Sequence, residues 1–584
     1  MLPKIQELPY IRADGKAKKA TVIPVNFSLE GLTDEEILVI GHLSKASDGM
    51  TPIFAQQNYD KALDMFGALL VAETRQRDTA VRRALNSYNT LFAAGNSPWE
   101  YTSGLGFRFP LHRDSISTFH PLAEFIELLM HGFQAPPGRG LYPVGITNPE
   151  IDGLEDSLRV NSSIAQNLDG SLRVILHEER YKNDLEPVIA EIKRAKNITS
   201  NKSLQKYLAA KVDELRTGSL EAREASNHAW LNLNGSIDFI IGTGTETYLD
   251  KVRGVRGVAQ ASVCRVNNKY QDFSDSFLGM LQDLEQRTPW EHKKKIDASN
   301  TPRLRFVDVA TWSGDYDPFP TTTLAQSLPN EQDFKERYGS VNLVFANVQE
   351  AVGKAGDQIF IRDEFMPKSI IGVVWDQIYS MRLIMSAAHE ISHASGGVVI
   401  DADPKHCFGK EYTRMEEARA ELFSMWALPI LVEKGIINQT QEIAGYYSMV
   451  FAMIRSLQEA PHDHAGSRNM MFNYFIEKGA LVEREEDGKL KYGVNAEIMR
   501  AAVTEMLKTI ANIRATGDKE GLEKFKSQYL SEARKGEFEK RLEAMPQGRL
   551  LIFPTIKMNG DRYTRDLAYP LTFMEQTRTL NNFV

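Results

Sequence analysis

Cysteine is scarce in this chain, which has only Cys264 and Cys407 among its 584 residues. Two cysteines make no disulfide framework of the kind that stabilises small secreted domains. Neither cysteine stands beside a histidine pair in a zinc-ligand pattern. We therefore expect the protein to reside in a reducing cytoplasm.

Long apolar runs are also absent. No stretch reaches the roughly 20 apolar residues that a membrane-spanning helix needs. The opening MLPKIQELPYIRADGKAKKA lacks the apolar core of a secretory signal. The net charge of −8 disfavours nucleic acid as the main partner. The sequence therefore predicts neither a membrane nor a nucleic-acid partner.

The composition that remains is that of an ordinary globular protein, with 42% hydrophobic and 25% charged residues. The length allows two or three domains. Helix-forming residues with recurring apolar spacing dominate 32–94 and 177–230. Strand-like runs are fewer, at 303–310 and 341–346, and 370–375 is either a strand or a helix start. This pattern predicts an α+β protein that is predominantly helical.

A short glycine-containing segment, Gly242-Thr243-Gly244, follows the apolar run 237–241. It suggests a nucleotide-binding loop, but Thr247 stands where the third glycine of GxGxxG is required. The segment is therefore predicted to be a turn.

Histidine is sparse too, yet two of the 12 histidines stand four residues apart in His389-Glu390-Ile391-Ser392-His393. On a helix, residues i and i+4 share a face, so both imidazoles can reach one metal ion. Glu390 lies about 100° round the helix and is a candidate general base for a water on that ion. Good helix formers precede the motif, and Gly396-Gly397 predicts the helix end. The alternative is a buried helix whose histidines are satisfied by hydrogen bonds alone.

A zinc hydrolase of this kind needs a third ligand. In the pattern HExxHxxGxxH that ligand is a histidine, but Val399 occupies its position here. In the other common solution it is a glutamate from a following helix, and the helical segment 412–423 carries Glu416, Glu417 and Glu421. A charged surface helix is the alternative interpretation. However, the apolar residues that follow argue against full exposure, and buried acids need a cationic partner.

The HEISH motif together with Glu416-Glu417-Ala418-Arg419-Ala420-Glu421 resembles the dipeptidyl-peptidase III family of zinc exopeptidases. The short HExxH form is similar to that of some bacterial members. The resemblance implies one Zn²⁺ per chain, held by His389, His393 and Glu417. It also implies that Glu390 is the general base.

Further blocks extend the resemblance. Glu416 and Glu421 are implied to orient the ligand imidazoles. The segment Glu246-Thr247-Tyr248-Leu249-Asp250 resembles the family's Glu-x-Tyr-x-Asp block. The resemblance implies that Glu246 holds the substrate ammonium and that Tyr248 helps to polarise the scissile carbonyl.

Two other segments carry implied substrate contacts. Ser327-Leu328-Pro329-Asn330 resembles the family's Asn-x-Pro-Asn loop, with Asn330 matching and Ser327 replacing the first asparagine. The loop is implied to bind the amino end of the substrate. His464-Ala465-Gly466-Ser467-Arg468 resembles a His-x-x-x-Arg segment, in which His464 stabilises the transition state and Arg468 contacts substrate.

The family resemblance also implies two lobes around a wide cleft. One lobe is helical, binds zinc and is catalytic, and the other contains a small β-barrel core. Mapped onto this sequence, the barrel-containing lobe comprises 1–259, 311–357 and 552–584. The helical zinc-binding lobe comprises 260–310 and 358–551.

The predicted function is a zinc-dependent peptidase that releases dipeptides from the free amino end of short peptides. One alternative is a zinc hydrolase with shifted specificity, either an endopeptidase or a hydrolase of non-peptide amides. The other is a non-catalytic peptide-binding relative. Glu390 argues against the latter, because binding alone requires no base. The oligomeric state is left open.

Overall fold

The computed structural model describes residues 6–154, 159–250, 252, 254–296, 303–316, 319–320, 322–401, 403–458, 463–546, 548–559 and 562–568. The chain divides into two compact units. Unit 1 comprises 1–266, 307–351 and 546–584, and unit 2 comprises 267–306 and 352–545. The predicted lobe boundaries lie a few residues away from these divisions. The predicted assignment of 569–584 falls outside the described residues.

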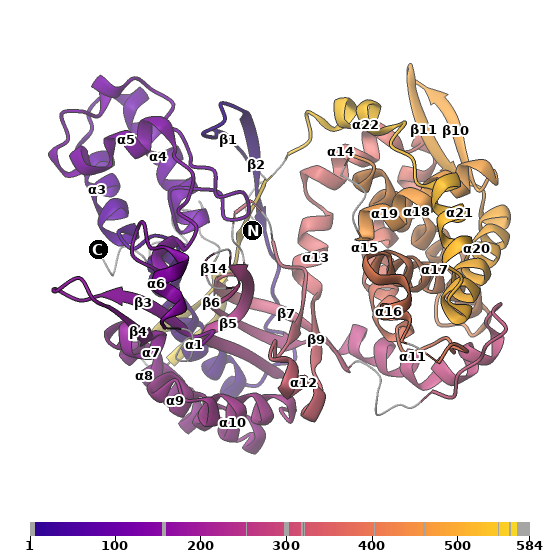
Figure 1. Cartoon of the computed structure of the whole chain (residues 1–584), viewed down its shortest axis with the longest axis horizontal. Coiled ribbons are helices and arrows are strands. Elements are labelled where there is room, and N and C mark those ends of the chain that lie inside the picture. Colours follow the sequence, from indigo (N-terminus) through magenta and orange to yellow (C-terminus); the bar gives the residue numbers. More distant parts are fainter. Residues whose placement is uncertain are drawn as a thin grey trace. The chain divides into compact units, whose positions relative to one another are not determined.

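Unit 1 contains a five-stranded sheet with the strand order β5-β6-β7-β9-β8 (Figure 1). Its strands are β5 (Ile237–Asp250), β6 (Gly254–Val266), β7 (Arg303–Gly314), β8 (Ala325–Leu328) and β9 (Val341–Phe345). Strands β5 and β8 are its edges, so the described strands form an open sheet. The predicted β-barrel core is therefore not confirmed.

Strands β5 and β6 form a long antiparallel hairpin with one irregularity. Gly242 pairs with Gln260 and Glu246 pairs with Val258, so β5 has more residues than β6 between these two pairs. The predicted turn at Gly242–Gly244 is wrong, because β5 continues through it to Asp250. The missed signal is the strand's β-branched and apolar character, which persists on both sides of the glycines.

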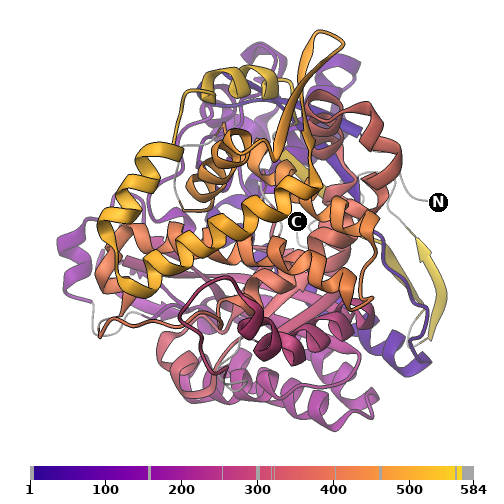
Figure 2. The same ribbon diagram turned by 90° about the vertical axis from the view of Figure 1, so that its right-hand side faces the viewer.

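The other strands make smaller sheets. They are β1 (Gln6–Ile11), β2 (Ala17–Pro24) and β12 (Gly548–Ile552) in one sheet, the hairpins β3 (Ser162–Gln166) with β4 (Leu172–Leu176) and β10 (Leu481–Glu486) with β11 (Lys489–Val494), and the pair β13 (Thr555–Asn559) and β14 (Arg562–Ala568). The β10–β11 hairpin belongs to unit 2 and projects from its helices (Figures 1 and 2).

The helical predictions for 32–94 and 177–230 are confirmed as two series of helices in unit 1. The helices of this unit are α1 (Asp34–Asp48), α2 (Thr51–Asn58), α3 (Ala62–Arg75), α4 (Thr79–Gly95), α5 (Ile126–His131), α6 (Asn148–Asp152), α7 (His177–Arg180), α8 (Lys182–Ile198), α9 (Lys202–Thr217), α10 (Leu220–Leu231), α12 (Gln332–Tyr338) and α13 (Ala346–Gly353), the last ending just past the unit boundary. Local sequence explains their ends. For example, Thr33 and Glu36 form a capping box at the start of α1, and Gly218 ends α9 at φ +60.

Unit 2 is predominantly helical. Its helices are α11 (Asn268–Arg287), α14 (Gly356–Phe365), α15 (Lys368–Ser392), α16 (Pro404–Phe408), α17 (Tyr412–Glu433), α18 (Gln439–Ser456), α19 (Asp463–Glu477), α20 (Ala496–Thr516), α21 (Lys519–Tyr529) and α22 (Lys535–Leu542). Residues 370–375 lie within α15 and are thus helix rather than strand. Residues 418–428 of α17 are buried without interruption, so this helix is covered on every side and lacks an amphipathic pattern.

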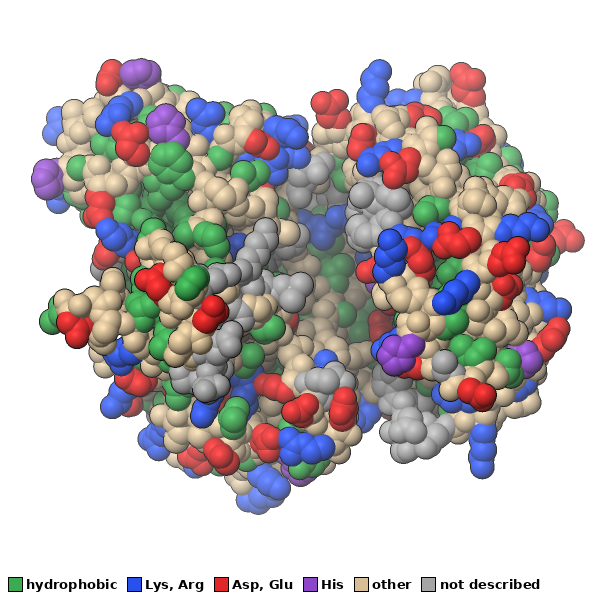
Figure 3. All heavy atoms as spheres, viewed as in Figure 1, with side chains coloured by type: hydrophobic (Ala, Val, Ile, Leu, Met, Phe, Trp, Pro, Cys, Tyr) green, Lys and Arg blue, Asp and Glu red, His purple; other side chains and the backbone are tan. Residues whose placement is uncertain are grey.

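The surface is mixed in charge. On the face seen in Figure 3, acidic and basic side chains are interspersed over both units, and the described residues of that face form no continuous basic patch. None of the described helices combines the length and apolarity required to span a bilayer.

Candidate metal centre

Helix α15 carries the histidine pair at its end. His389 lies in the last turn, and His393 follows the final helical residue with φ −57 and ψ −25, so it continues the helical path. The helix ends at Ser392, before the predicted stop at Gly396-Gly397. Two serine hydroxyls satisfy carbonyls there: Ser392 donates to His389 O at 2.7 Å, and Ser395 donates to Ser392 O at 2.6 Å.

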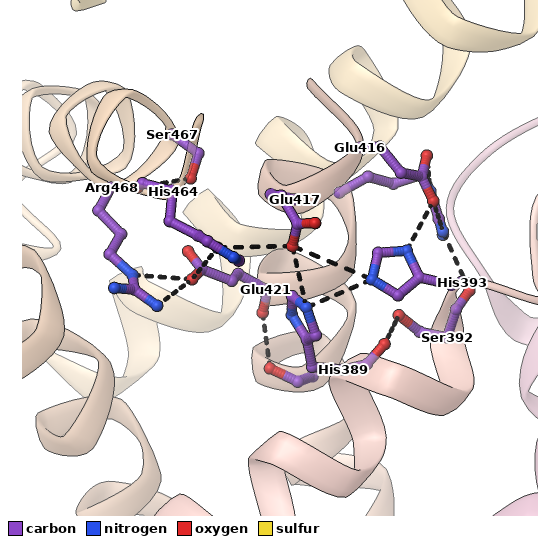
Figure 4. Close-up of polar contacts among 11 residues, drawn as sticks. His389, Ser392, His393, Glu416, Glu417, Glu421, His464, Ser467 and Arg468 are labelled. Atoms are coloured by element: carbon purple, nitrogen blue, oxygen red, sulfur yellow. Dashed lines mark hydrogen bonds and ion pairs between the residues drawn. The ribbon is translucent and has the colours of Figure 1, made fainter. Parts of the chain in front are cut away.

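Three potential ligand atoms converge between α15 and α17 (Figure 4). The Nε2 atoms of His389 and His393 are 3.3 Å apart. Glu417 Oε2 lies 3.1 Å from His389 Nε2 and 4.0 Å from His393 Nε2. Two imidazole nitrogens and one carboxylate oxygen form a donor set that suits zinc and leaves a fourth position open.

The environment of Glu417 Oε2 indicates that these atoms suit a shared cation. This oxygen is buried and, among the described residues, accepts no hydrogen bond. Three imidazole nitrogens lie within 4.0 Å of it, from His389, His393 and His464, but none meets it with hydrogen-bond geometry. A buried carboxylate oxygen left in this way is costly unless a cation satisfies it. The residues present therefore fit a divalent metal ion.

Glu416 supports the imidazole of His393. Its Oε1 is 3.0 Å from His393 Nδ1, which orients Nε2 of the same ring toward Glu417. Glu416 also forms ion pairs with Arg419 and with Arg514, whose Nε lies 2.8 Å from Glu416 Oε2. Burial alone would raise the pKa of Glu416, but Arg419, His393 and Arg514 hold the pKa well below its usual range. The carboxylate is therefore ionised and fixed.

Arg419 links this pair to the end of α15. Its side chain is fully buried. Besides Glu416, it donates to Ser395 Oγ at 3.1 Å and to Ser392 O at 3.0 Å. Arg419 thus connects the helix that carries Glu417 to the turn that follows the histidine pair.

Glu421 has a different set of partners from the one predicted. Arg468 donates Nε to Glu421 Oε1 at 2.8 Å, and His464 Nδ1 lies 3.8 Å from the same oxygen. Burial opposes ionisation of Glu421, but Arg468 and His464 lower its pKa to about 2. Within the described part of the chain, no hydrogen bond joins Glu421 to the imidazole of His389 or His393.

His464 is the second residue of α19 (Asp463–Glu477) and is half-exposed beside this cluster. Its Nδ1 lies 3.5 Å from Glu417 Oε2 (Figure 4). The neighbouring carboxylates of Glu421 and Glu417 raise the pKa of His464, which favours the protonated imidazole. The predicted base, Glu390, lies on α15 between the two histidines and is partly exposed.

The remaining predicted residues belong to unit 1. Glu246 and Tyr248 lie on β5, and Ser327 lies exposed on the edge strand β8. Asn330 donates to Thr245 O at 3.0 Å and is 3.5 Å from Glu246 Oε1. The structure therefore brings Asn330 and Glu246 together.

Sequence reasoning missed three residues that contact predicted ones. Arg419 stands three residues after Glu416, and this spacing on a helix could have predicted their ion pair. Arg514 lies on α20, and Asp315 Oδ2 lies 2.5 Å from Tyr248 Oη. No spacing in the sequence connects either of these two to its partner.

Comparison with known proteins supports the resemblance found in the sequence. Residues 154–403 match Peptidase family M49. This part of the chain is thus similar to a peptidase family. The matched range includes Glu246, Tyr248 and the HEISH motif, whereas Glu417 and His464 lie beyond it.

Individual relatives are distant. The chain is 25% identical over 429 residues to Nudix hydrolase 3 from Arabidopsis thaliana, an alignment that covers 66% of this chain and 53% of the relative. It is 27% identical over 169 residues to dipeptidyl peptidase 3 from Rattus norvegicus, covering 29% of this chain and 22% of that protein. The chain thus spans about half the length of the first relative and less of the second.

Solved structures share the fold. The structure of DPP III from Caldithrix abyssi matches with a TM-score of 0.73 and 22% identity, covering 91% of this chain and 97% of that one. The structure of dipeptidyl-peptidase III from Corallococcus sp. strain EGB matches with a TM-score of 0.61 and 20% identity, covering 91% and 94%. The predominantly helical α+β prediction is confirmed by this likeness and by the elements described above.

Proposed function

We propose that this chain is a zinc-dependent peptidase that releases dipeptides from the free amino end of short peptides. The observation that carries the proposal is the convergence of His389 Nε2, His393 Nε2 and Glu417 Oε2, with Glu417 Oε2 buried and accepting no hydrogen bond in the described structure. The relation to Peptidase family M49 supports the peptidase class.

The three ligand residues would hold one Zn²⁺ per chain. When bound, zinc supplies Lewis acidity and can lower the pKa of a water molecule to about 7. Glu416 supports this site by fixing the ring of His393, since its carboxylate contacts His393 Nδ1 at 3.0 Å. Glu421 supports it less directly, through His464.

The chain's own residues then carry the proton transfers. Glu390 accepts a proton from the attacking water at its carboxylate and delivers it to the departing amine. His464 and Tyr248 donate hydrogen bonds to the carbonyl oxygen as negative charge develops on it. The pKa of His464, which the neighbouring carboxylates of Glu421 and Glu417 raise, favours the donating form of the imidazole.

Release of dipeptides requires recognition of a free α-ammonium group. We assign this recognition to Glu246 and Asn330, whose side chains lie 3.5 Å apart in unit 1. Ser327 and Arg468 are proposed as further substrate contacts. The guanidinium of Arg468 is already bound to Glu421, which limits Arg468 to a contact made with its remaining N–H groups.

The products from a defined oligopeptide test the proposal. The zinc-loaded protein is incubated with the peptide in free and N-acetylated form, and products are identified by mass spectrometry. Dipeptides released from the free peptide alone support the proposal. Internal cleavage of both peptides would indicate an endopeptidase. Two intact peptides would indicate a non-catalytic binding protein.

Two substitutions test the assigned roles. Glu390→Gln is expected to leave the zinc content unchanged and to lower turnover by about 10²–10⁴-fold, the usual contribution of a general base. Glu417→Ala is expected to lower the zinc content itself. Glu433→Ala, at the exposed end of the same helix, is the matched control and should change neither quantity. Full zinc content in Glu417→Ala would refute the ligand assignment.

A further inference from the structure

The hydroxyl of Tyr248 meets a buried carboxyl group. Tyr248 Oη and Asp315 Oδ2 are 2.5 Å apart, which is a short hydrogen bond between β5 and the residue after β7. The backbone holds Asp315 in place, since its N–H donates to Ala259 O at 3.1 Å. Tyr248 is partly exposed, whereas Asp315 is only 3% exposed. The contact therefore joins a partly exposed tyrosine to a buried acid.

Few groups compensate a charge on Asp315. Its second oxygen, Oδ1, is buried and makes no hydrogen bond within the described residues. The ring of Tyr101 packs edge-on against Tyr248, with centroids 5.7 Å apart. Tyr248 thus supplies the hydrogen bond that Asp315 Oδ2 makes.

Two arginines lie near Asp315 without forming an ion pair with it in the described structure. The guanidinium carbon of Arg256 lies 6.0 Å from the centre of the Tyr248 ring, and that of Arg139 lies 4.5 Å from the centre of the Tyr101 ring. Neither forms an ion pair with Asp315 in the part of the chain that is described. Glu246 on β5 adds a negative charge nearby.

These surroundings favour the protonated carboxyl. An ionised carboxylate in a buried site needs a cationic partner or several donors, and among the described residues Asp315 forms no ion pair and has the phenols of Tyr248 and Tyr101 beside it. Burial accordingly raises the pKa of Asp315 to about 8, while Tyr248, Tyr101 and Arg256 oppose the rise and Glu246 adds to it.

The protonation state of Asp315 decides what Tyr248 can do, because a phenol has a single proton. If Asp315 is ionised, the phenol donates its proton to the carboxylate and has none for a ligand. If Asp315 is protonated, the acid donates to the phenol oxygen. The tyrosine proton is then free to point elsewhere.

We propose that Asp315 is a positioning residue: its protonated carboxyl donates to Tyr248 Oη and so leaves the tyrosine proton available to the carbonyl oxygen of a bound peptide. The proposal rests on the peptidase function argued above and adds to it a residue that does not itself touch substrate.

Asp315→Asn provides the decisive variant, because its amide keeps a donor for the phenol oxygen and cannot ionise. At pH 7 its kcat is expected to stay within about threefold of the wild type, whereas Tyr248→Phe is expected to lower kcat by about 100-fold. Above about pH 8 the wild-type kcat should fall relative to that of Asp315→Asn, by tenfold for each further pH unit. Asp315→Ala, which cannot ionise either, should likewise lack this fall above pH 8.

Two outcomes would overturn the proposal. One is a kcat for Asp315→Asn as low as that of Tyr248→Phe at pH 7, which would mean that the carboxylate is required. The other is an unchanged ratio of wild-type to Asp315→Asn kcat between pH 7 and 10.

A second readout is independent of activity. If the wild type releases no dipeptide, the proposed function fails, but thermal unfolding still tests the state of Asp315. The midpoint of the wild type should fall relative to that of Asp315→Asn between pH 5 and 8. Asp169→Asn, which changes an exposed carboxyl of the same unit, is the control and should not alter this pH dependence. Parallel curves for wild type and Asp315→Asn would overturn the proposal.

Discussion

Three buried carboxyl groups, two in unit 2 and one in unit 1, differ in the direction in which their pKa values shift. In unit 2, Glu416 and Glu421 are each paired with at least one guanidinium group, and their pKa values are lowered despite burial. In unit 1, burial raises the pKa of Asp315, which has a phenol as its hydrogen-bond partner. The comparison shows that the partner, rather than burial, decides whether a buried acid keeps its charge.

The largest expected effect comes from removing the partner in unit 2. Arg419→Met leaves Glu416 as a buried charge with reduced compensation, and we expect a loss of about 3–5 kcal/mol in the free energy of unfolding. Urea unfolding monitored in unit 2 measures this loss. Arg287→Met, which breaks an exposed ion pair with Glu433 in the same unit, is the control and should stay near wild-type stability. Equal losses of stability in the two variants would contradict the claim that the buried partner of Glu416 matters more than an exposed ion pair.

Metal removal should act on unit 2 alone. At a free zinc concentration about 1,000 times the dissociation constant, bound zinc adds about 4 kcal/mol to stability. Chelation should therefore accelerate hydrogen exchange in α15 and α17, and leave β5 to β7 unchanged. Equal acceleration in both units would contradict the assignment of the metal to unit 2.

Acid should weaken unit 2 by discharging Glu421. Its folded pKa of about 2 lies below the unfolded value, so the stabilisation is complete above about pH 5 and is lost as pH falls toward 2. The difference in pKa corresponds to about 3 kcal/mol. Glu421→Gln should lack this component of the acid transition. An acid transition of Glu421→Gln as steep as that of the wild type would show that other groups dominate it.

The last prediction concerns zinc affinity, which depends on how Glu416 orients the imidazole ring of His393. Glu416→Gln keeps an acceptor for His393 Nδ1 but removes the charge, and we expect zinc affinity to fall by about 10–100-fold. It also leaves buried Arg419 with less compensation, so the affinity is measured where the variant is fully folded. A competition assay with a fluorescent chelator measures it. Glu411→Gln is the matched control, because Glu411 lies just before α17 and pairs with Arg414 rather than with a predicted ligand.

Local patterns in the sequence predicted the parts of the site that depend on spacing along one helix. His389 and His393 share a face because they are four residues apart, and the helix of 412–423 was recognised from its composition. The end of α15 was placed too late because the serine hydroxyls that satisfy its carbonyls give no clear stop signal.

Other parts depend on contacts between distant segments. Arg514 reaches Glu416 from another helix, and Asp315 reaches Tyr248 from the turn after β7. Strand β6 was not predicted either, since residues 256–264 are buried on both faces and show no polar alternation. Such features follow from tertiary packing, which a single sequence does not display.

The irregularity of β5 sets a rule for engineering this hairpin. Four residue steps separate Gly242 from Glu246, while the partner strand takes two steps from Gln260 to Val258. Side chains alternate between faces with a period of two, so shortening β5 here by one residue would send Glu246 and Tyr248 to the opposite side. Shortening it by two would preserve their facing, which makes parity, rather than loop length, the constraint on deletions at this position.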